Sequence, residues 1–300
     1  MILSFENIEK SYGDHRVLDG ISLVAESGKA CGLLGRNGAG KTTAIRILTD
    51  VLPADGGKIL VDGKPIDYTA LKFGYLPEER GLYPKKKIIE QLVYFARLKG
   101  MNTADATAAS DRWLARLGMS EYRNRKLETL SKGNQQKIQL ITALTHDPDI
   151  VILDEPFSGL DPVNAKLLSD VVVEEIQRGK IVFFSSHQMN YIEEFCEDIA
   201  ILNTGRIAVS GRLRDIKRSY PRNRLEISGP DAKRVAEAFP GSCTVTGEDA
   251  IILKLASPED KRRIMRELSE KYDLDMIKVA EPTLNDIFVE YADHDAEETK

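Results

Sequence analysis

The sequence has few cysteines, no long apolar run and no excess of basic residues. Its three cysteines, Cys31, Cys196 and Cys243, are far apart and form no CxxC or Cys/His ligand pattern, so we expect reduced thiols and no disulfide framework. No apolar run approaches the roughly 20 residues that cross a bilayer. Residues 1–6 have no basic segment before an apolar stretch. We therefore expect no secretory signal and a cytoplasmic chain.

Charge is nearly balanced, with 42 Lys and Arg residues against 47 Asp and Glu residues and a formal charge of −5. A protein that wraps nucleic-acid phosphates over a wide face needs a basic surface, so that class is disfavoured. The composition, 42% hydrophobic and 30% charged, is typical of a folded globular chain. A length of 300 residues corresponds to roughly two domains.

Apolar periodicity indicates an α/β protein. Short alternating segments and Asp-Gly turns in the first third predict antiparallel strands around one embedded α/β unit. Apolar residues recur at helical spacing from residue 88 to 98, and a second helix is expected over about 104–117. Residues 150–153 and 181–184 are wholly apolar, as parallel strands covered on both faces require, and a helix is expected over 163–177 between them.

The pattern changes after a basic segment that ends at Tyr220-Pro221. We place a domain boundary there, with one domain over residues 1–218 and a second over 219–300. The second domain is predicted to run β-α-β-β-α-β, the order of a ferredoxin-like α+β fold. A short helix over 283–291 and an acidic tail from Asp293 onward are expected to follow.

Residues 35–42 fit the pattern G-x-x-x-x-G-K-[ST] and lie between an apolar segment and a predicted helix. Glycines let successive backbone N–H groups converge on a phosphate at the positive end of that helix. Lys41 would bridge the β- and γ-phosphates, and Thr42 would bind Mg²⁺. The alternative is a glycine-rich turn that only starts a helix. The expected ATP-binding residues of this segment are Gly35, Arg36, Asn37, Gly38, Ala39, Gly40, Lys41, Thr42 and Thr43.

Two carboxylates, Asp154 and Glu155, follow the apolar run 150–153, at the strand end where open α/β sheets bind ligands. Asp154 would hold Mg²⁺, and Glu155 would polarise the water that attacks the γ-phosphorus. The alternative is an acidic pair that caps the next turn. His187 follows the run 181–184 and is expected at the same edge, where a neutral imidazole can donate to the γ-phosphate or to the attacking water. The other histidines are interpreted as structural or surface residues.

Five motifs in order resemble the ATP-binding cassette (ABC) ATPases over about residues 1–215. They are the phosphate loop, Leu130-Ser131-Lys132-Gly133-Asn134, Asp154-Glu155, Ser158-Gly159-Leu160-Asp161 and Ser185-Ser186-His187. The resemblance implies a P-loop NTPase core with an antiparallel β subdomain and a helical subdomain at about 85–135. It also implies that two cassettes face each other head to tail and share each ATP.

In that family a signature segment of one subunit contacts the nucleotide of the other. Ser131 and Gly133 match the family's Leu-Ser-Gly-Gly-Gln at the positions expected to touch the γ-phosphate, whereas Lys132 and Asn134 depart from it. The alternative is a plain N-cap for a helix over 135–145. Asp161 resembles the aspartate that links the two sites across the dimer.

Two further positions are assigned through the resemblance. Tyr12 lies where the family places an aromatic residue that stacks on adenine, and the alternative is an edge-strand aromatic. Glu78 lies at the position of the family's Q-loop glutamine and is the clearest departure, although a carboxylate can still serve as a Mg²⁺ ligand.

The second domain resembles the small C-terminal domain of bacterial ABC-2 type export ATPases. The resemblance as a whole implies the ATPase subunit of a bacterial ABC exporter. Its partners would be a separate transmembrane permease subunit and a second cassette, expected to be a copy of this chain, with no nucleic acid. The chain would lie at the inner face of the cell membrane, held only through the permease. Two alternatives are a soluble ABC protein that acts on ribosomes or nucleic acid, and a nucleotide sensor that does not hydrolyse ATP.

Overall fold

The structure, a computed structural model, describes residues 1–79 and 81–293. The chain divides into two compact units. The first comprises Met1–Leu213 and the segment from Phe288 onward, and the second comprises Arg214–Ile287. This division lies five residues before the predicted boundary, and it assigns the residues from Phe288 onward to the first unit instead of the second. The predicted acidic tail beyond Asp293 lies outside the described residues.

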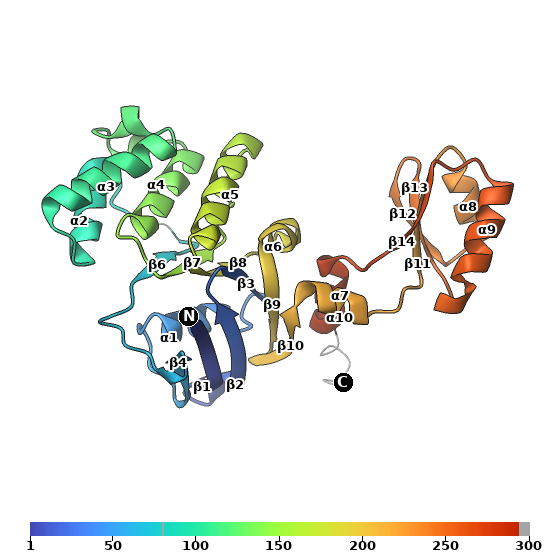
Figure 1. Cartoon of the computed structure of the whole chain (residues 1–300), viewed down its shortest axis with the longest axis horizontal. Coiled ribbons are helices and arrows are strands. Elements are labelled where there is room, and N and C mark those ends of the chain that lie inside the picture. The colour runs from blue at the N-terminus through green and yellow to red at the C-terminus, as the bar shows by residue number, and fades with distance from the viewer. Residues whose placement is uncertain (80, 294–300) are drawn as a thin grey trace. The chain divides into compact units, whose positions relative to one another are not determined.

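The first unit contains an antiparallel sheet with the strand order β2-β1-β4-β5 (Figure 1). Alternate residues of β1, among them Leu3 and Phe5, are buried because one face of this sheet packs on the core. This is the antiparallel part predicted from the first third of the sequence. Its strands are β1 (Ile2–Tyr12), β2 (His15–Glu26), β4 (Gly56–Val61) and β5 (Lys64–Pro65).

A six-stranded sheet with the order β10-β9-β3-β8-β7-β6 carries the core of the first unit. Neighbouring strands are parallel except for β10, which pairs with β9 in antiparallel fashion. Every residue of β7 and β8 is buried, which agrees with the prediction from the apolar runs 150–153 and 181–184. The strands are β3 (Lys29–Leu34), β6 (Phe73–Leu76), β7 (Ile150–Asp154), β8 (Ile181–Ser185), β9 (Cys196–Asn203) and β10 (Arg206–Arg212).

Helices connect these strands, and the run of helices between β6 and β7 forms the helical part of the unit (Figure 1). One of them, α4, begins at Lys132, three residues before the predicted start. No helix among residues 1–79 and 81–293 is long and apolar enough to cross a membrane. The α-helices of the first unit are α1 (Lys41–Leu48), α2 (Ile88–Leu98), α3 (Thr103–Arg116), α4 (Lys132–Leu144), α5 (Pro162–Gln177) and α6 (Met189–Phe195).

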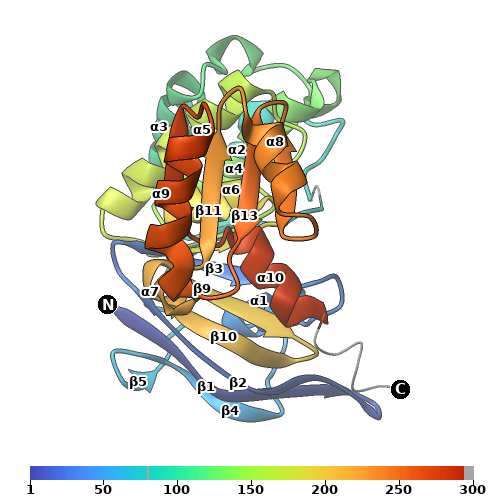
Figure 2. The same cartoon turned by 90° about the vertical axis from the view of Figure 1, so that its right-hand side faces the viewer.

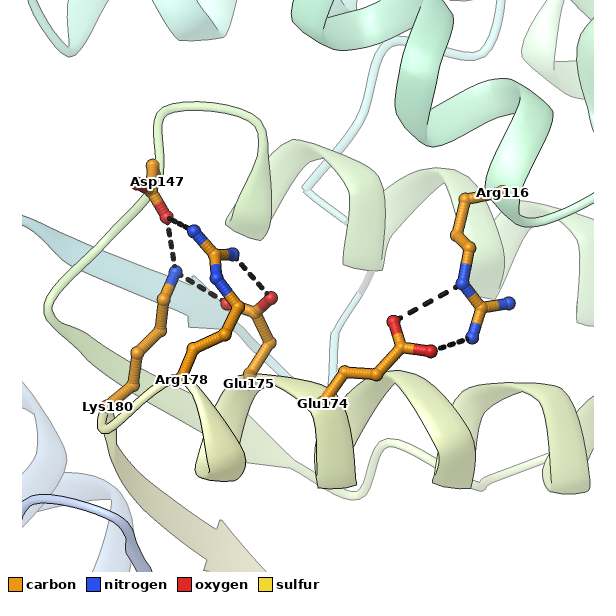
Figure 3. Close-up of polar contacts among 6 residues, drawn as sticks. All are labelled: Arg116, Asp147, Glu174, Glu175, Arg178 and Lys180. Atoms are coloured by element: carbon orange, nitrogen blue, oxygen red, sulfur yellow. Dashed lines mark hydrogen bonds and ion pairs between the residues drawn. The ribbon is translucent and has the colours of Figure 1, made fainter.

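Ion pairs attach α5 to its surroundings (Figure 3). Arg116 at the end of α3 pairs through two nitrogens with Glu174 on α5. The ammonium of Lys180, which follows α5, lies 2.5 Å from Glu175 Oε2 and 2.6 Å from Asp147 Oδ1. Lys180 and Glu175 are both buried, so this pair is shielded from solvent, whereas Arg116 and Glu174 are partly exposed.

The second unit contains a four-stranded antiparallel sheet with the order β12-β13-β11-β14 (Figure 2). The order along the chain is β-α-β-β-α-β, and two helices cover one face of the sheet, so the predicted ferredoxin-like arrangement is confirmed. Its core includes Leu225, Ile251 and Leu268. The elements are α7 (Leu213–Ser219), β11 (Arg224–Ser228), α8 (Ala232–Ala238), β12 (Cys243–Gly247), β13 (Ala250–Lys254), α9 (Lys261–Lys271) and β14 (Met276–Ala280). The last helix, α10 (Leu284–Asp293), begins in the second unit and ends in the first.

Candidate functional site

The glycine-rich loop joins the end of β3 to the start of α1. A Cβ added at Gly35 would lie 2.5 Å from Leu202 O, and one at Gly40 would lie 2.6 Å from Leu18 Cδ2, so neither position has room for a side chain. Gly40 also has a φ of +109°, which disfavours any other residue. Lys41 Nζ donates to Gly35 O at 2.5 Å, which curls the side chain back over the loop.

The start of α1 is open to an anion. No side chain caps this helix, because its N-cap is Gly40. The first-turn amides of Lys41, Thr42 and Thr43 have no partner within the helix and carry the positive end of its dipole. Arg36, Asn37, Gly38 and Thr42 are exposed, whereas Ala39 is buried beneath the loop. The predicted segment therefore has the strand, loop and helix context that phosphate binding needs.

Asp154 ends β7, and Glu155 turns the chain away from the sheet with a φ of +50°. A left-handed conformation is uncommon for a residue with a side chain. The Glu155 N–H donates to Ser185 O at 2.8 Å, which ties this turn to the end of the neighbouring strand β8. Both carboxylates are buried, with 7% of Asp154 and 8% of Glu155 exposed.

Three donors hold the Glu155 carboxylate. Ser186 Oγ donates to Oε2 at 3.0 Å, and the His187 backbone N–H donates to Oε1 at 2.7 Å. His187 Nδ1 lies 2.8 Å from the same Oε1, so this nitrogen carries the proton of a hydrogen bond to the carboxylate. Ser186 was not predicted as a site residue, although it precedes His187 in the quoted motif.

Electrostatics join this acidic pair to the phosphate loop. Burial raises the pKa of Asp154, and the nearby charges of Glu78 and Glu155 raise it further, while Lys41 opposes them. Burial also lowers the pKa of Lys41 against the attraction of the same three carboxylates. The fold therefore brings Lys41, the pair Asp154-Glu155 and Glu78 from three separate segments to one place.

Two unpredicted residues of α4 hold the loops that carry Glu78 and the acidic pair. Gln139 Nε2 donates to Pro77 O at 2.8 Å and to Glu79 O at 3.2 Å. Gln136 Nε2 donates to Pro156 O at 3.1 Å, directly after the acidic pair. Both glutamines are buried. The available sequence signal was the presence of amides on a helix whose other buried residues are mostly apolar.

The signature segment lies at the exposed start of α4. Ser131 is its N-cap, because Ser131 Oγ accepts from the Asn134 N–H at 3.3 Å, and this contact explains the early start of the helix. A Cβ at Gly133 would lie 3.7 Å from Gly159 O, so this segment adjoins the residues before α5. Asp161 caps α5 by accepting from the Val163 and Asn164 amides.

Some predicted residues remain apart from the acidic pair within one chain. Among the described residues, no hydrogen bond or ion pair links Ser131 or Asp161 to Lys41, Asp154 or Glu155. Tyr12 ends β1 beyond the last residue paired with β4, and 48% of it is exposed. Its ring contacts the Lys10 ammonium at 6.0 Å.

The donors at the site fit Mg²⁺ only in combination with a phosphate. Within the part of the chain that the structure describes, no three His, Cys, Asp or Glu side chains are placed to hold a metal by themselves. Asp154, Glu78 and the Thr42 hydroxyl are hard oxygen donors around Lys41. Mg²⁺ is commonly coordinated by one or two carboxylates, with substrate phosphates and water as its other ligands. This donor set is compatible with such coordination.

A glycine-rich loop before a helix, with an acidic pair at the end of a nearby parallel strand, is the nucleotide site of P-loop ATPases. The added antiparallel sheet and helical segment are those of ATP-binding cassettes. The chain belongs to the family of ABC transporter ATP-binding proteins. The family model described as ABC transporter matches residues 18–158, and that of the ATP-binding protein DrrA1-3-like C-terminal domain matches residues 211–292.

Relatives support this assignment along nearly the whole chain. The ABC transporter ATP-binding protein YhaQ of Bacillus subtilis is 43% identical over 291 residues, which cover 96% of this chain and 98% of the relative. The Nod factor export ATP-binding protein I of Burkholderia lata is 31% identical over 87% of this chain and 88% of its own length. A solved ATP-binding subunit of an ABC transporter has a TM-score of 0.67 and 28% identity, over 73% of this chain and 93% of that chain. The chain is therefore a nucleotide-binding ATPase subunit.

Proposed function

We propose that this chain hydrolyses ATP to drive a separate membrane subunit of a bacterial ABC exporter. The observation that carries the proposal is the meeting of Lys41, Asp154 and Glu155 beside an open helix start. Export is supported by the similarity to a Nod factor export ATP-binding protein and by the match to a DrrA1-3-like C-terminal domain.

The phosphate loop would bind the triphosphate tail of ATP. Residues 35–43 supply the converging amides, and the Lys41 ammonium would move from Gly35 O to the β- and γ-phosphates. The exposed ring of Tyr12 would stack on adenine. Thr42, Asp154 and Glu78 would hold a Mg²⁺ ion, which when bound neutralises charge on phosphate oxygens.

Glu155 would accept hydrogen bonds from the attacking water and direct it in line at the γ-phosphorus. Ser186 and the His187 amide keep its carboxylate in one orientation. With Nδ1–H bonded to Glu155, Nε2 is the ring nitrogen of His187 that is left for the attacking water or the γ-phosphate. Most of the rate acceleration would come from positioning and charge stabilisation.

A second copy of the chain would complete each site. Ser131 and Asp161 are exposed and stay unlinked to the phosphate loop of their own chain, although Gly133 and the residues before α5 adjoin one another. The open amides at the start of α4 suit a γ-phosphate held by the partner. We therefore propose a head-to-tail homodimer in which ATP is bound between Lys41 of one copy and Ser131 of the other.

The membrane subunit would dock on the helical part. Tyr83, Tyr94 and Leu98 are about half exposed or more, and a cavity of about 370 Å³ is lined by the two tyrosines with Lys86, Glu90 and Gln91. Exposed aromatic side chains around a hollow are typical of protein interfaces. Such docking would hold the chain peripherally at the inner face of the cell membrane.

Phosphate release and nucleotide binding by two variants test this proposal. Glu155→Gln keeps the shape but removes the charge, so we expect retained ATP binding, a trapped dimer and turnover reduced by roughly 10²- to 10⁴-fold. Lys41→Ala should instead weaken ATP binding itself. Glu174→Gln, an exposed change on α5, is the matched control. Normal hydrolysis by Glu155→Gln would refute the role of Glu155. Absence of turnover by the wild-type chain with its membrane subunit would favour a nucleotide sensor.

A further inference from the structure

The side chain of Gln139 holds the backbone on both sides of Glu78. Its Nε2 donates to Pro77 O at 2.8 Å and to Glu79 O at 3.2 Å. A carboxamide nitrogen has two hydrogens, so both donors of this group are used. Only 4% of Gln139 is exposed. Because a buried amide costs stability unless it is hydrogen-bonded, the loop carbonyls and Gln139 satisfy one another.

The loop needs such an anchor because strand pairing ends before it. β6 stops at Leu76, which pairs with Leu153 on β7, so the Pro77 and Glu79 carbonyls lie beyond the ladder. Glu78 itself is exposed, yet its charge acts on both Lys41 and Asp154. Its carboxylate direction therefore depends on the two peptide groups that Gln139 contacts.

The helix that carries Gln139, α4, packs closely against β6. A Cβ at Gly74 of β6 would lie 2.3 Å from Ala143 O, so α4 and β6 approach at backbone distance. One turn before Gln139, Gln136 Nε2 donates to Pro156 O beside the acidic pair. Successive turns of α4 thus contact both loops that carry site carboxylates, and the same helix begins at Ser131.

We propose that Gln139 is a positioning residue that aims the Glu78 carboxylate at Lys41 and Asp154. The inference rests on the proposed function, because it concerns the same ATP site. Gln139 acts only through Glu78. Replacing Gln139 should therefore lower turnover when Glu78 is present and have no further effect when Glu78 is absent. A residue that merely supports the fold has no such dependence.

A double-mutant cycle tests this on the full-length chain. Gln139→Met keeps the length of the side chain but removes both donors, and Glu78→Ala removes the carboxylate. We expect each single variant to lower kcat about tenfold, with ATP affinity within about twofold of wild type, and the double variant to match Glu78→Ala. Additive losses in the double variant, or an unchanged kcat in Gln139→Met, would overturn the proposal.

Hydrogen–deuterium exchange without nucleotide or metal supplies a second readout. Gln139→Met should speed exchange at the Glu78 and Glu79 amides and leave β7 protected. The matched control is Thr142→Val, one turn further along α4, whose hydroxyl donates to Ile138 O of the same helix. Unchanged exchange at the two amides would refute the positioning role of Gln139 even if no ATP turnover were found.

The remaining outcomes are also decisive. In one outcome the wild-type chain does not hydrolyse ATP, but exchange at the Glu78 and Glu79 amides still rises in Gln139→Met. That result would support the contact of Gln139 with the Glu78 loop and refute the proposed function. If Gln139→Met and Gln139→Leu both fail to fold while Thr142→Val folds, Gln139 is a stability residue and the positioning role is overturned.

Discussion

At the scale of single residues, Glu155 combines a left-handed backbone with a place in the candidate site. Such a conformation costs a residue with a side chain about 1–3 kcal/mol. The backbone bond to Ser185 O and the three donors at its carboxylate compensate for this cost. Conformational strain that a fold maintains at a residue of the candidate site is consistent with a functional role for that residue.

A second residue of interest, His146, is buried beside β6. Its Nε2 lies 2.9 Å from Phe73 O, and 4% of the residue is exposed. Burial lowers its pKa from 6.5 to about 4, so the ring is neutral in the folded chain at neutral pH. This agrees with its interpretation from sequence as a structural or surface histidine.

We predict that His146 contributes to acid sensitivity. Between pH 6.5 and 4, His146 binds a proton in the unfolded chain but not in the folded chain. The contribution of the neutral ring to the free energy of unfolding is therefore complete above pH 6.5 and decreases as the pH falls toward 4. From pH 7 to pH 5 the free energy of unfolding of the wild type should fall by about 2 kcal/mol more than that of His146→Gln. Urea unfolding at both pH values measures this difference. Equal losses in both proteins would contradict it.

At the scale of elements, α5 is attached by two unlike ion-pair groups. Glu174 pairs with Arg116 near the surface, and such pairs contribute about 0–1 kcal/mol. Glu175 pairs with Lys180 at 2.5 Å, with side chains that are 3% and 8% exposed. Arg178 also reaches Glu175 from the end of the helix (Figure 3). Loss of one partner in the buried group leaves a charge without full compensation.

We predict that Lys180→Met lowers the free energy of unfolding by about 3 kcal/mol. The combined change Lys180→Met with Glu175→Leu should recover part of this loss, because it removes the uncompensated carboxylate. Glu174→Gln should change stability by less than about 1 kcal/mol. Thermal or urea unfolding of the three variants provides the measurement. A double variant less stable than Lys180→Met would show that the pair is not coupled in this way.

At the scale of the whole molecule, the two units have separate hydrophobic cores. The core of the first unit includes Leu3, Ile152 and Phe183, and that of the second includes Leu225, Ile251 and Leu268. Every residue expected to contact ATP lies in the first unit. Ligand binding stabilises only the part of a protein whose folded state binds it.

We therefore predict two calorimetric transitions, of which ATP shifts one. In the Glu155→Gln variant, ATP at about 100 times its Kd should raise the Tm of the first unit by about 5–10 °C and leave the second within about 1 °C. Lys41→Ala under the same conditions should show a smaller shift of the first transition. One cooperative transition, or equal shifts of both, would contradict the independence of the two units.

Much of this protein was determined by the sequence alone, because its signals are local. The pattern at residues 35–42, the apolar runs that became β7 and β8, and the order of elements in the second unit each depend on neighbours a few residues away. The start of α4 was misplaced by three residues, because Ser131 caps the helix directly and Lys132 is already its first residue.

Only the tertiary structure decided which distant groups meet. The contacts of Gln139 with Pro77 and Glu79, and of Glu155 with Ser186 and His187, join residues that lie about 30 to 60 positions apart. Periodicity and spacing do not encode such pairs, because they arise when parallel strands and a covering helix bring separate loops to one sheet edge. The pKa shifts of Lys41 and Asp154 follow from the same convergence, since burial and neighbouring charge exist only in the folded chain.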